Sequence, residues 1–362
     1  MRRRRARLAV LSLLIAIILV GGCTRQQAQR PGPPTPTQKL KVGIVYDVGG
    51  RGDLSFNDMA FAGLERAQKE FEDRIETRDL EPTAGGENRE ELLRLLASEG
   101  FTLIFGIGFL FTDSIQRVAK EFPNVKFGLV DGFIEGLDQN SNVVCLLFKE
   151  HEGSFLVGAA AGLKSQTGVV GFVGGMKIPL IEKFEAGYIA GARYVKPSTR
   201  VLSDYAGTTG EAFRDPVKGK ELALAQYDRR ADIIYHASGG TGIGVFEAAV
   251  TKDKLAIGVD ADQSLTVKED QRAQILTSML KRVDVAIHET IQGFVNTTFA
   301  GGYRTLGLAE GGVGYAENDH NREMIADIKD RLEALKQKII AGEIKVPENR
   351  TELSTFLQNL PK

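Results

Sequence analysis

The stretch "KVGIVYDVGGRGDLSFNDMAFAGLERA", residues 41–67, decides the fold of this chain. An apolar run ends at Asp47, three glycines follow within four residues, and apolar residues then recur at helical spacing from about Ser55. A strand that is apolar at consecutive positions is buried on both faces, which is typical of a parallel sheet covered by helices. The stretch therefore predicts a strand, a glycine-rich turn and a helix of an α/β protein.

The same pattern recurs along the chain. Strands are expected at "FTLIFGIG", "KFGLVDG", "GVVGFVGG", "RVLSDYAG", "ADIIYHAS", "KLAIGVD" and "AQILTSML", mostly separated by amphipathic helical segments. This number of units suits two doubly wound parallel sheets better than one. In open parallel sheets a ligand binds beyond the carboxyl ends of the strands. Those ends are predicted at Asp47, Gly106, Asp131, Gly174, Gly207, Ser238, Asp260 and Lys281.

Export to the outside of a membrane is indicated by the N-terminus. Five arginines within residues 2–7 precede an apolar run from Leu8 to Val20, which is the arrangement of a signal peptide and shorter than the ~20 residues of a membrane-spanning helix. The run ends in "VGGC", so residues 1–22 are expected to be removed and Cys23 to carry a lipid anchor. An ordinary signal cleavage site with an incidental cysteine is the alternative.

A tether is predicted after Cys23. The segment "TRQQAQRPGPPTPTQ" is polar and contains four prolines, and 15 extended residues reach roughly 45 Å. Loss of the leader with its five arginines changes the net charge from −1 to about −6, which argues against a nucleic-acid polymer as partner. The other cysteine, Cys145, lies in "NVVCLLF" and is expected to be a buried thiol, so no disulfide is predicted.

Most motifs of catalysis are missing. The glycine-rich stretches lack the Gly-Lys-Ser/Thr ending of a phosphate loop and the spacing of a dinucleotide fingerprint. Asp260 and Asp262 form an isolated Asp-x-Asp pair, and no histidine cluster accompanies it, so neither a metal nor any other cofactor is expected. No Ser/His/Asp or Cys/His arrangement can be nominated, and we expect no catalytic residue.

Phe56 is an unusual residue for the mouth of a glycine-rich loop. Its ring could lie flat against a planar ligand, with the Asn57 amide offering a donor and an acceptor to the ligand's edge. The alternative is a hydrophobic staple that packs Phe56 on its own helix. The turn at Gly239 and Gly240 similarly allows either helix N–H groups facing the ligand or a close-packed turn without ligand contact.

Nine segments together resemble one family, the basic membrane protein (PnrA-like) purine nucleoside receptors of ABC transporters. They run in order over roughly residues 41–300: "DVGGRGDLSFNDMAFAGL", "GIGFLFTDSI", "KFGLVDG", "EGSFLVGAAAG", "VGGMKIPLIEKFEAGYIAGA", "DPVKGKELA", "SGGTGIGVFEAA", "IGVDADQ" and "TSMLKRVDVAI". The resemblance implies two α/β lobes of the periplasmic-binding-protein type, joined by three crossings and closing on ligand by a hinge. With crossings near residues 148, 281 and 302, the first lobe would hold 41–147 and 282–302, and the second 148–281 and 303–345. Residues 23–40 would be the lipidated tether, and 346–362 a C-terminal segment.

The resemblance also implies roles for individual residues. Phe56 would stack on the purine, and Phe213 would supply the second stacking face, although "YAGTTGEAFRDP" departs from the family's spacing. Asp47, Asn57 and Asp131 would meet the edge of the base. Asp260 and Lys281 would bind the ribose hydroxyls, close to the turn at Gly239 and Gly240, unless they form only a structural ion pair.

The sequence thus predicts a lipid-anchored, extracytoplasmic receptor, not an enzyme, that captures purine nucleosides for an ABC permease and acts as a monomer. A sugar receptor of the same fold is one alternative, because aromatic rings also stack on sugars. A nucleoside-cleaving enzyme would need a metal-binding aspartate cluster or a general acid, and neither is found. A surface lipoprotein that senses a ligand or mediates adhesion, with the same pocket but no permease, is another alternative.

Overall fold

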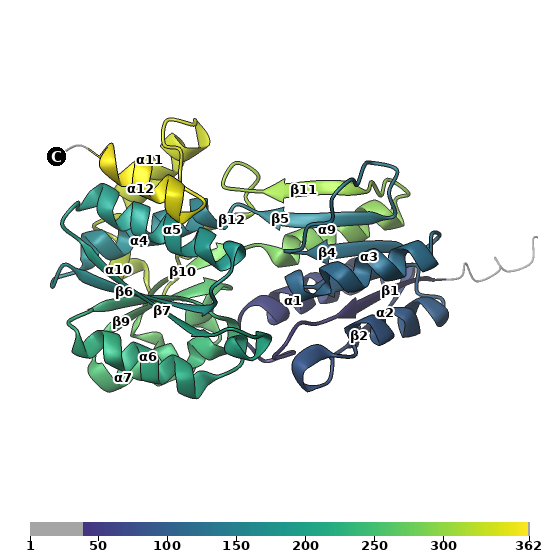
Figure 1. Cartoon of the computed structure of the whole chain (residues 1–362), viewed down its shortest axis with the longest axis horizontal. Coiled ribbons are helices and arrows are strands. Elements are labelled where there is room, and N and C mark those ends of the chain that lie inside the picture. Colours follow the sequence, from purple (N-terminus) through teal and green to yellow (C-terminus); the bar gives the residue numbers. More distant parts are fainter. Residues whose placement is uncertain (1–38, 361–362) are drawn as a thin grey trace, which may run out of the picture. The chain divides into compact units, whose positions relative to one another are not determined.

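The computed structural model describes residues 39–360. The predicted signal peptide, Cys23 and the tether up to residue 38 lie outside the described residues. Within 39–360 the chain forms two lobes, each built on one six-stranded sheet (Figure 1). No helix in this range has the length and apolar composition needed to cross a membrane.

The first lobe is a parallel sheet with helices on both faces. Its strands lie in the order β11-β5-β4-β3-β1-β2. Side chains of α1 and α9 form the core on one face, and those of α2 and α3 form the core on the other. The elements are β1 (Leu40–Val45), α1 (Phe56–Glu70), β2 (Ile75–Leu80), α2 (Arg89–Ser98), β3 (Leu103–Ile107), α3 (Thr112–Glu121), β4 (Lys126–Val130), β5 (Val143–Phe148), α9 (Val283–Val295) and β11 (Gly302–Leu306).

The second lobe repeats this plan. Its strand order, β12-β10-β9-β8-β6-β7, matches that of the first sheet position by position. One sheet face packs on α4 and α5, and the other on α6 and α7 (Figure 1). The elements are α4 (Glu150–Lys164), β6 (Val169–Met176), α5 (Pro179–Val195), β7 (Arg200–Gly207), α6 (Pro216–Asp228), β8 (Ile233–Ala237), α7 (Gly242–Lys252), β9 (Leu255–Asp260), α8 (Glu269–Arg272), β10 (Ile275–Lys281), β12 (Val313–Tyr315), α10 (Arg322–Ile325), α11 (Lys329–Ile340) and α12 (Arg350–Gln358).

The predicted two-sheet α/β fold is therefore correct, with one difference in strand direction. The short strand β12 runs antiparallel to β10, whereas every other strand pair in the described part of the chain is parallel. The central strands β3 and β8 are buried at every position, and Cys145 in β5 is buried as well, which explains the continuous apolar sequences of these strands.

The chain passes between the lobes three times. Two crossings follow Phe148 and Lys281. The third comes after Leu306, later than the predicted 302, because β11 pairs with β5 from Gly302 to Leu306 and so belongs to the first sheet. The C-terminal helix α12 packs on α5, and the Arg350 guanidinium donates to both carboxylate oxygens of Glu185 at 3.0 and 2.8 Å. Residues 346–360 are thus part of the second lobe.

Candidate functional site

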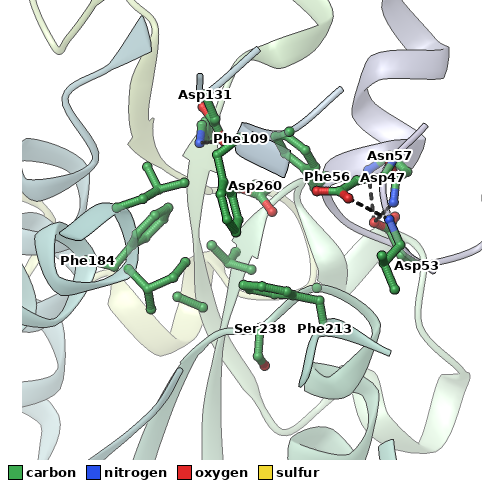
Figure 2. A pocket seen from close by; sticks show the side chains of 18 residues that line it. Asp47, Asp53, Phe56, Asn57, Phe109, Asp131, Phe184, Phe213, Ser238 and Asp260 are labelled. Carbon is green, nitrogen blue, oxygen red and sulfur yellow. Dashed lines mark hydrogen bonds and ion pairs between the residues drawn. The ribbon is translucent and has the colours of Figure 1, made fainter. Parts of the chain in front are cut away.

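A cavity lies at the carboxyl ends of the strands of both sheets. Eighteen residues line it, and the polar members among them come mainly from strand ends and from the loop before α1 (Figure 2). Parallel strands bring their carboxyl ends to one edge of each sheet, which is why residues distant in sequence meet here.

The glycine-rich loop before α1 is held by Asp53. Its carboxylate accepts hydrogen bonds from the backbone N–H groups of Ser55 (2.9 Å), Asn57 (2.9 Å) and Asp58 (3.2 Å), and from the Asn57 side-chain amide (3.1 Å). These are N–H groups that the first turn of a helix leaves unpaired. Ser55 occupies the N-cap position but makes no side-chain cap. Asp53 therefore caps α1 in place of Ser55.

Ser55 instead connects the two lobes. Its hydroxyl group donates a hydrogen bond to Asp260 Oδ2 in the second lobe at 2.6 Å. The Ser55 hydroxyl oxygen also lies 3.3 Å from the carbonyl oxygen of Val259. Because Ser55 is fully buried, this hydrogen bond is shielded from water. A loop of the first lobe thus directly contacts a strand end of the second.

Lys281 is the centre of a buried charge cluster. Its ammonium nitrogen lies 2.5 Å from Asp131 Oδ2 and 3.0 Å from Glu150 Oε1, and only 1 % of its side chain is exposed. Three phenylalanine rings surround the same nitrogen at 5.0–5.5 Å, those of Phe56, Phe148 and Phe184. The neighbouring carboxylates raise the pKa of Lys281 above its ordinary value despite burial. The lysine is therefore charged at neutral pH.

The carboxylates around Lys281 retain capacity to accept hydrogen bonds. Asp131 Oδ1 is buried and has no hydrogen-bond partner among the described residues. Burial raises the pKa of Asp131 and of Asp260, while the Lys281 charge opposes the rise. An unpaired buried acceptor is costly, so a ligand that donates a hydrogen bond to Asp131 gains correspondingly.

Asp131 and Asp260 occupy equivalent places in the two lobes. Asp131 follows β4, Asp260 ends β9, and these strands have the same position in their sheets. Both residues adopt φ = 62°, in the left-handed region that non-glycine residues rarely occupy. Strain of this kind clusters at binding and active sites. The backbone thus turns one carboxylate of each lobe into the same cavity.

Four aromatic rings form much of the rest of the wall. Phe56 begins α1, Phe109 begins the 3₁₀ turn Phe109–Phe111, Phe184 lies on α5, and Phe213 ends the 3₁₀ turn Gly210–Phe213. Figure 2 shows these side chains converging from both lobes. Phe109 and Phe213 make an edge contact, with centroids 6.4 Å apart and an interplanar angle of 67°. The lining suits a flat, largely apolar ring.

Eight of the nine predicted binding residues line this cavity: Asp47, Phe56, Asn57, Asp131, Phe213, Gly239, Asp260 and Lys281. The ninth, Gly240, lies beside it, where a Cβ would come 3.5 Å from the carbonyl oxygen of Phe213. Asp131, which was predicted to act with Asp47 and Asn57 on the base edge, instead contacts Lys281. Phe56 faces Lys281 and the cavity rather than acting only as a staple on its own helix.

Ten of the lining residues were not predicted, and three of these, Asp53, Phe109 and Phe184, contribute a carboxylate or an aromatic ring. Asp53 could have been found as a carboxylate inside the glycine-rich loop, and Phe109 as the aromatic residue just beyond the end of β3. Phe184 gives no such signal, because its place depends on how α5 packs. Glu150, which pairs with Lys281, and Arg89, which pairs with Asp47, also have no sequence signal.

The site offers little for catalysis or metal binding. No group of three or more histidine, cysteine, aspartate or glutamate residues within 39–360 is arranged to hold a metal ion. His236, beside the lining residue Ser238, is fully buried with Nε2 2.9 Å from Gln263 Oε1. Burial lowers the pKa of His236 to about 4, so the ring is uncharged at neutral pH. The arrangement is that of a binding pocket.

Comparisons with known proteins agree with this geometry. Residues 40–350 match the model of a family described as "ABC transporter substrate-binding protein PnrA-like". The "ABC transporter nucleoside-binding protein BmpA" of Lactococcus lactis is 33% identical over 92% of this chain and 96% of its own length. An uncharacterised lipoprotein of Pyrococcus furiosus is 34% identical over 100% of this chain and 98% of its own. A solved ABC solute-binding protein from Aeropyrum pernix K1 superimposes with a TM-score of 0.75 and 31% identity, covering 89% of this chain and 97% of that one.

Proposed function

Because the chain belongs to the PnrA-like family of ABC transporter substrate-binding proteins, it is a non-catalytic receptor that serves a permease, and we propose that its solute is a purine nucleoside. The observation that carries this proposal is one cavity that combines four phenylalanine rings with strand-end carboxylates and a buried lysine. The rings suit a purine, and the charged end suits a ribose.

Two kinds of contact would share the recognition. Base–aromatic stacking contributes about 1–3 kcal/mol per base in nucleic-acid proteins and is tolerant of the base's identity. Asp131 Oδ1, together with Asp260, accepts hydrogen bonds from ribose hydroxyls, while Lys281 holds Asp131 in place. Lys281 is the only cationic residue in the cavity lining within 39–360, which disfavours phosphorylated ligands.

Lobe closure over the nucleoside would deliver it to the permease. Ser55 directly precedes Phe56, and its hydrogen bond to Asp260 links the two lobes. The stacking ring and the ribose-binding carboxylate are thereby held together. We further propose that Cys23 carries the lipid that holds the receptor at the outer face of the membrane, in keeping with the name of the Pyrococcus relative.

Calorimetric titration tests the proposal. The full chain in detergent, freed of carried-over ligand by unfolding and refolding, is titrated with guanosine, inosine, adenosine, cytidine and ribose. We expect micromolar or tighter binding of purine nucleosides, weaker binding of cytidine and none of ribose. Binding of ribose with every nucleoside silent would overturn the proposal and favour a sugar receptor of the same fold.

A further inference from the structure

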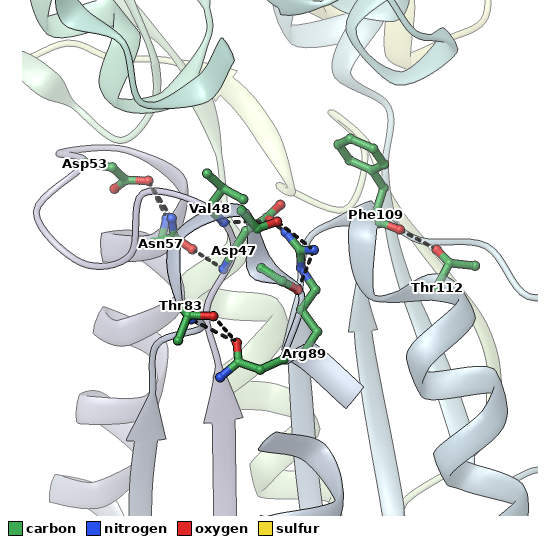
Figure 3. A network of polar contacts seen from close by, with 11 residues as sticks. Asp47, Val48, Asp53, Asn57, Thr83, Arg89, Phe109 and Thr112 are labelled. Atoms are coloured by element: carbon green, nitrogen blue, oxygen red, sulfur yellow. Dashed lines mark hydrogen bonds and ion pairs between the residues drawn. The ribbon is translucent and has the colours of Figure 1, made fainter. Parts of the chain in front are cut away.

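The Asp47 carboxylate has one oxygen that is engaged and one that faces the cavity. Oδ1 accepts the backbone N–H of Val48 at 2.7 Å and lies 3.4 Å from the Arg89 guanidinium (Figure 3). Oδ2 accepts no hydrogen bond within residues 39–360 and lies against Gly108, where a Cβ would come within 2.1 Å of it. The glycine thus leaves room for an acceptor at the cavity wall.

Arg89 is fixed behind this carboxylate and does not line the cavity. It is the first residue of α2, and its Nη1 donates to the carbonyl oxygen of Gly86 at 2.9 Å. Its guanidinium lies 5.5 Å from the centroid of the Phe111 ring, and 11 % of the side chain is exposed. Within the described residues Asp47 is the only acidic side chain in ion-pair distance of Arg89.

Asn57 offers less to a ligand than its amide suggests. Its Oδ1 accepts the backbone N–H of Asp47 at 3.0 Å, and its Nδ2 donates to Asp53 at 3.1 Å (Figure 3). One Nδ2 hydrogen remains. The strongest free group on this wall is therefore the acceptor Asp47 Oδ2, so the matching edge of a ligand must donate.

We propose that Arg89, without touching the ligand, sets the purine preference of the pocket by orienting Asp47 and compensating its charge, so that guanosine and inosine bind in preference to adenosine. This inference rests on the proposed function. Guanine presents N1–H and its exocyclic amino group side by side to a carboxylate, and hypoxanthine presents N1–H. Adenine places a lone pair at N1, which an ionised carboxylate repels and a protonated carboxyl group can satisfy.

The ionisation of Asp47 supports a preference for guanosine and inosine over adenosine. Burial raises the pKa of Asp47 to about 6, and the Val48 N–H and Arg89 oppose the rise. At neutral pH the carboxylate is ionised and favours guanosine. Below about pH 6 it becomes protonated, and the advantage of guanosine over adenosine should shrink. The other titratable groups lining the cavity are Asp53, Asp131, Asp260 and Lys281, so variants must separate their effects from that of Asp47.

The decisive experiment measures dissociation constants for guanosine and adenosine by calorimetry of the full chain at about pH 5 and pH 8. In Arg89→Gln we expect the guanosine-to-adenosine preference at pH 8 to fall by roughly 10–100-fold, the effect of one mismatched buried polar contact. Arg89→Lys, which keeps the charge, should restore part of the preference. Arg94→Gln is the matched control, since Arg94 lies on the same helix and pairs with Glu90 and Glu121 at the surface.

Two further arms keep the inference falsifiable if Arg89→Gln fails to fold. The wild-type preference should decrease from pH 8 to pH 5, and Asp47→Asn should abolish this change while Asp131→Asn leaves it. An unchanged preference in folded Arg89→Gln, or equal affinities of the wild type for both nucleosides at pH 8, would refute the role of Arg89 while leaving the proposed function intact. A wild type that binds no purine nucleoside would overturn the proposed function and this inference together.

Discussion

Asp53 and Asp131 are both buried aspartates that line the same cavity, yet they are used differently. Asp53 accepts four hydrogen bonds from its own loop and helix. Asp131 gives one oxygen to Lys281 and leaves the other without a partner in the described part of the chain. The first carboxylate is saturated and fixes the backbone, whereas the second has capacity for a ligand.

The difference teaches that lining a cavity does not by itself identify a binding group. The hydrogen-bonding capacity that remains after the protein's own contacts is more informative. By this criterion Asp131 and Asp47 are candidates for ligand contact, and Asp53 is a positioning residue for Phe56 and Asn57. Variants at these positions should separate stability from affinity.

The largest expected effect is that of Lys281→Met. The change removes the ammonium group that pairs with Asp131 and Glu150, while Lys183 stays 3.6 Å from Glu150 Oε2. Breaking a buried ion pair typically costs about 3–5 kcal/mol, because the remaining charges are uncompensated. Thermal unfolding of the ligand-free protein should show this loss. The exposed pair of Lys220 with Glu247 provides the control, and a Lys220→Met variant as destabilised as Lys281→Met would contradict the interpretation.

Asp131→Asn should mainly affect affinity. The variant keeps the size of the side chain but weakens the acceptor that faces the cavity, so nucleoside affinity should fall about 10–100-fold. Stability should fall less than in Lys281→Met, because Glu150 still pairs with the Lys281 ammonium group at 3.0 Å. Calorimetric titration together with thermal unfolding checks both parts. Strong destabilisation with unchanged affinity would assign Asp131 a structural role.

Asp53→Ala should show the opposite pattern, with a smaller effect. Loss of the cap on α1 should lower the free energy of unfolding by about 1–2 kcal/mol. Nucleoside affinity should fall less, because Asp53 affects the ligand only through the position of Phe56. Chemical denaturation measures the first quantity. Asp113→Ala, at an exposed position in the first turn of α3, is a suitable control that should be nearly neutral. Equal effects of the two changes would exclude the capping role of Asp53.

The last prediction concerns the pH dependence of stability. The pKa of Asp47 is raised from 3.8 to about 6, so the folded protein binds more protons at this group than the unfolded chain does between these values. Its contribution to stability is therefore present at low pH and is lost as pH rises through about 6. The melting temperature of Asp47→Asn minus that of the wild type should increase from about pH 4 to 6 and then level off. A difference independent of pH would show that Asp47 does not titrate in this range.

The fold was largely predictable because its central strands are buried on both faces and leave a continuous apolar signal, as in "FTLIFGIG". The edge strand β7 was predicted from "RVLSDYAG", but the edge strands β2 and β11 were not. In β2, "IETRDL", and in β11, "GYRTL", polar residues face solvent and obscure the pattern. The third crossing was misplaced for this reason, since the sequence gives no sign that β11 extends the first sheet.

Part of the site was predictable for a similar reason. The rule that ligands meet strand ends selects Asp47, Asp131, Asp260 and Lys281 without knowledge of the packing. No such rule selects Phe184 or Glu150, because both lie on helices. The packing of these helices on the second sheet decides which of their side chains reach the cavity or Lys281. Asp131 contacts Lys281 rather than Asp47, because Lys281 stands at the end of β10, where the chain crosses from the second lobe to the first.

The matching strand order of the two lobes has a consequence for how a solute enters. The equivalent strands β5 and β10 end in different residues, Phe148 and Lys281, and the lysine lies against the phenylalanine ring at 5.0 Å. Two sheets with the same strand order thus carry different groups at equivalent strand ends, an aromatic ring in the first lobe and an ammonium group in the second. The two lobes therefore offer different groups to a solute, so a solute that contacts both lobes is bound in one orientation rather than in two related ones.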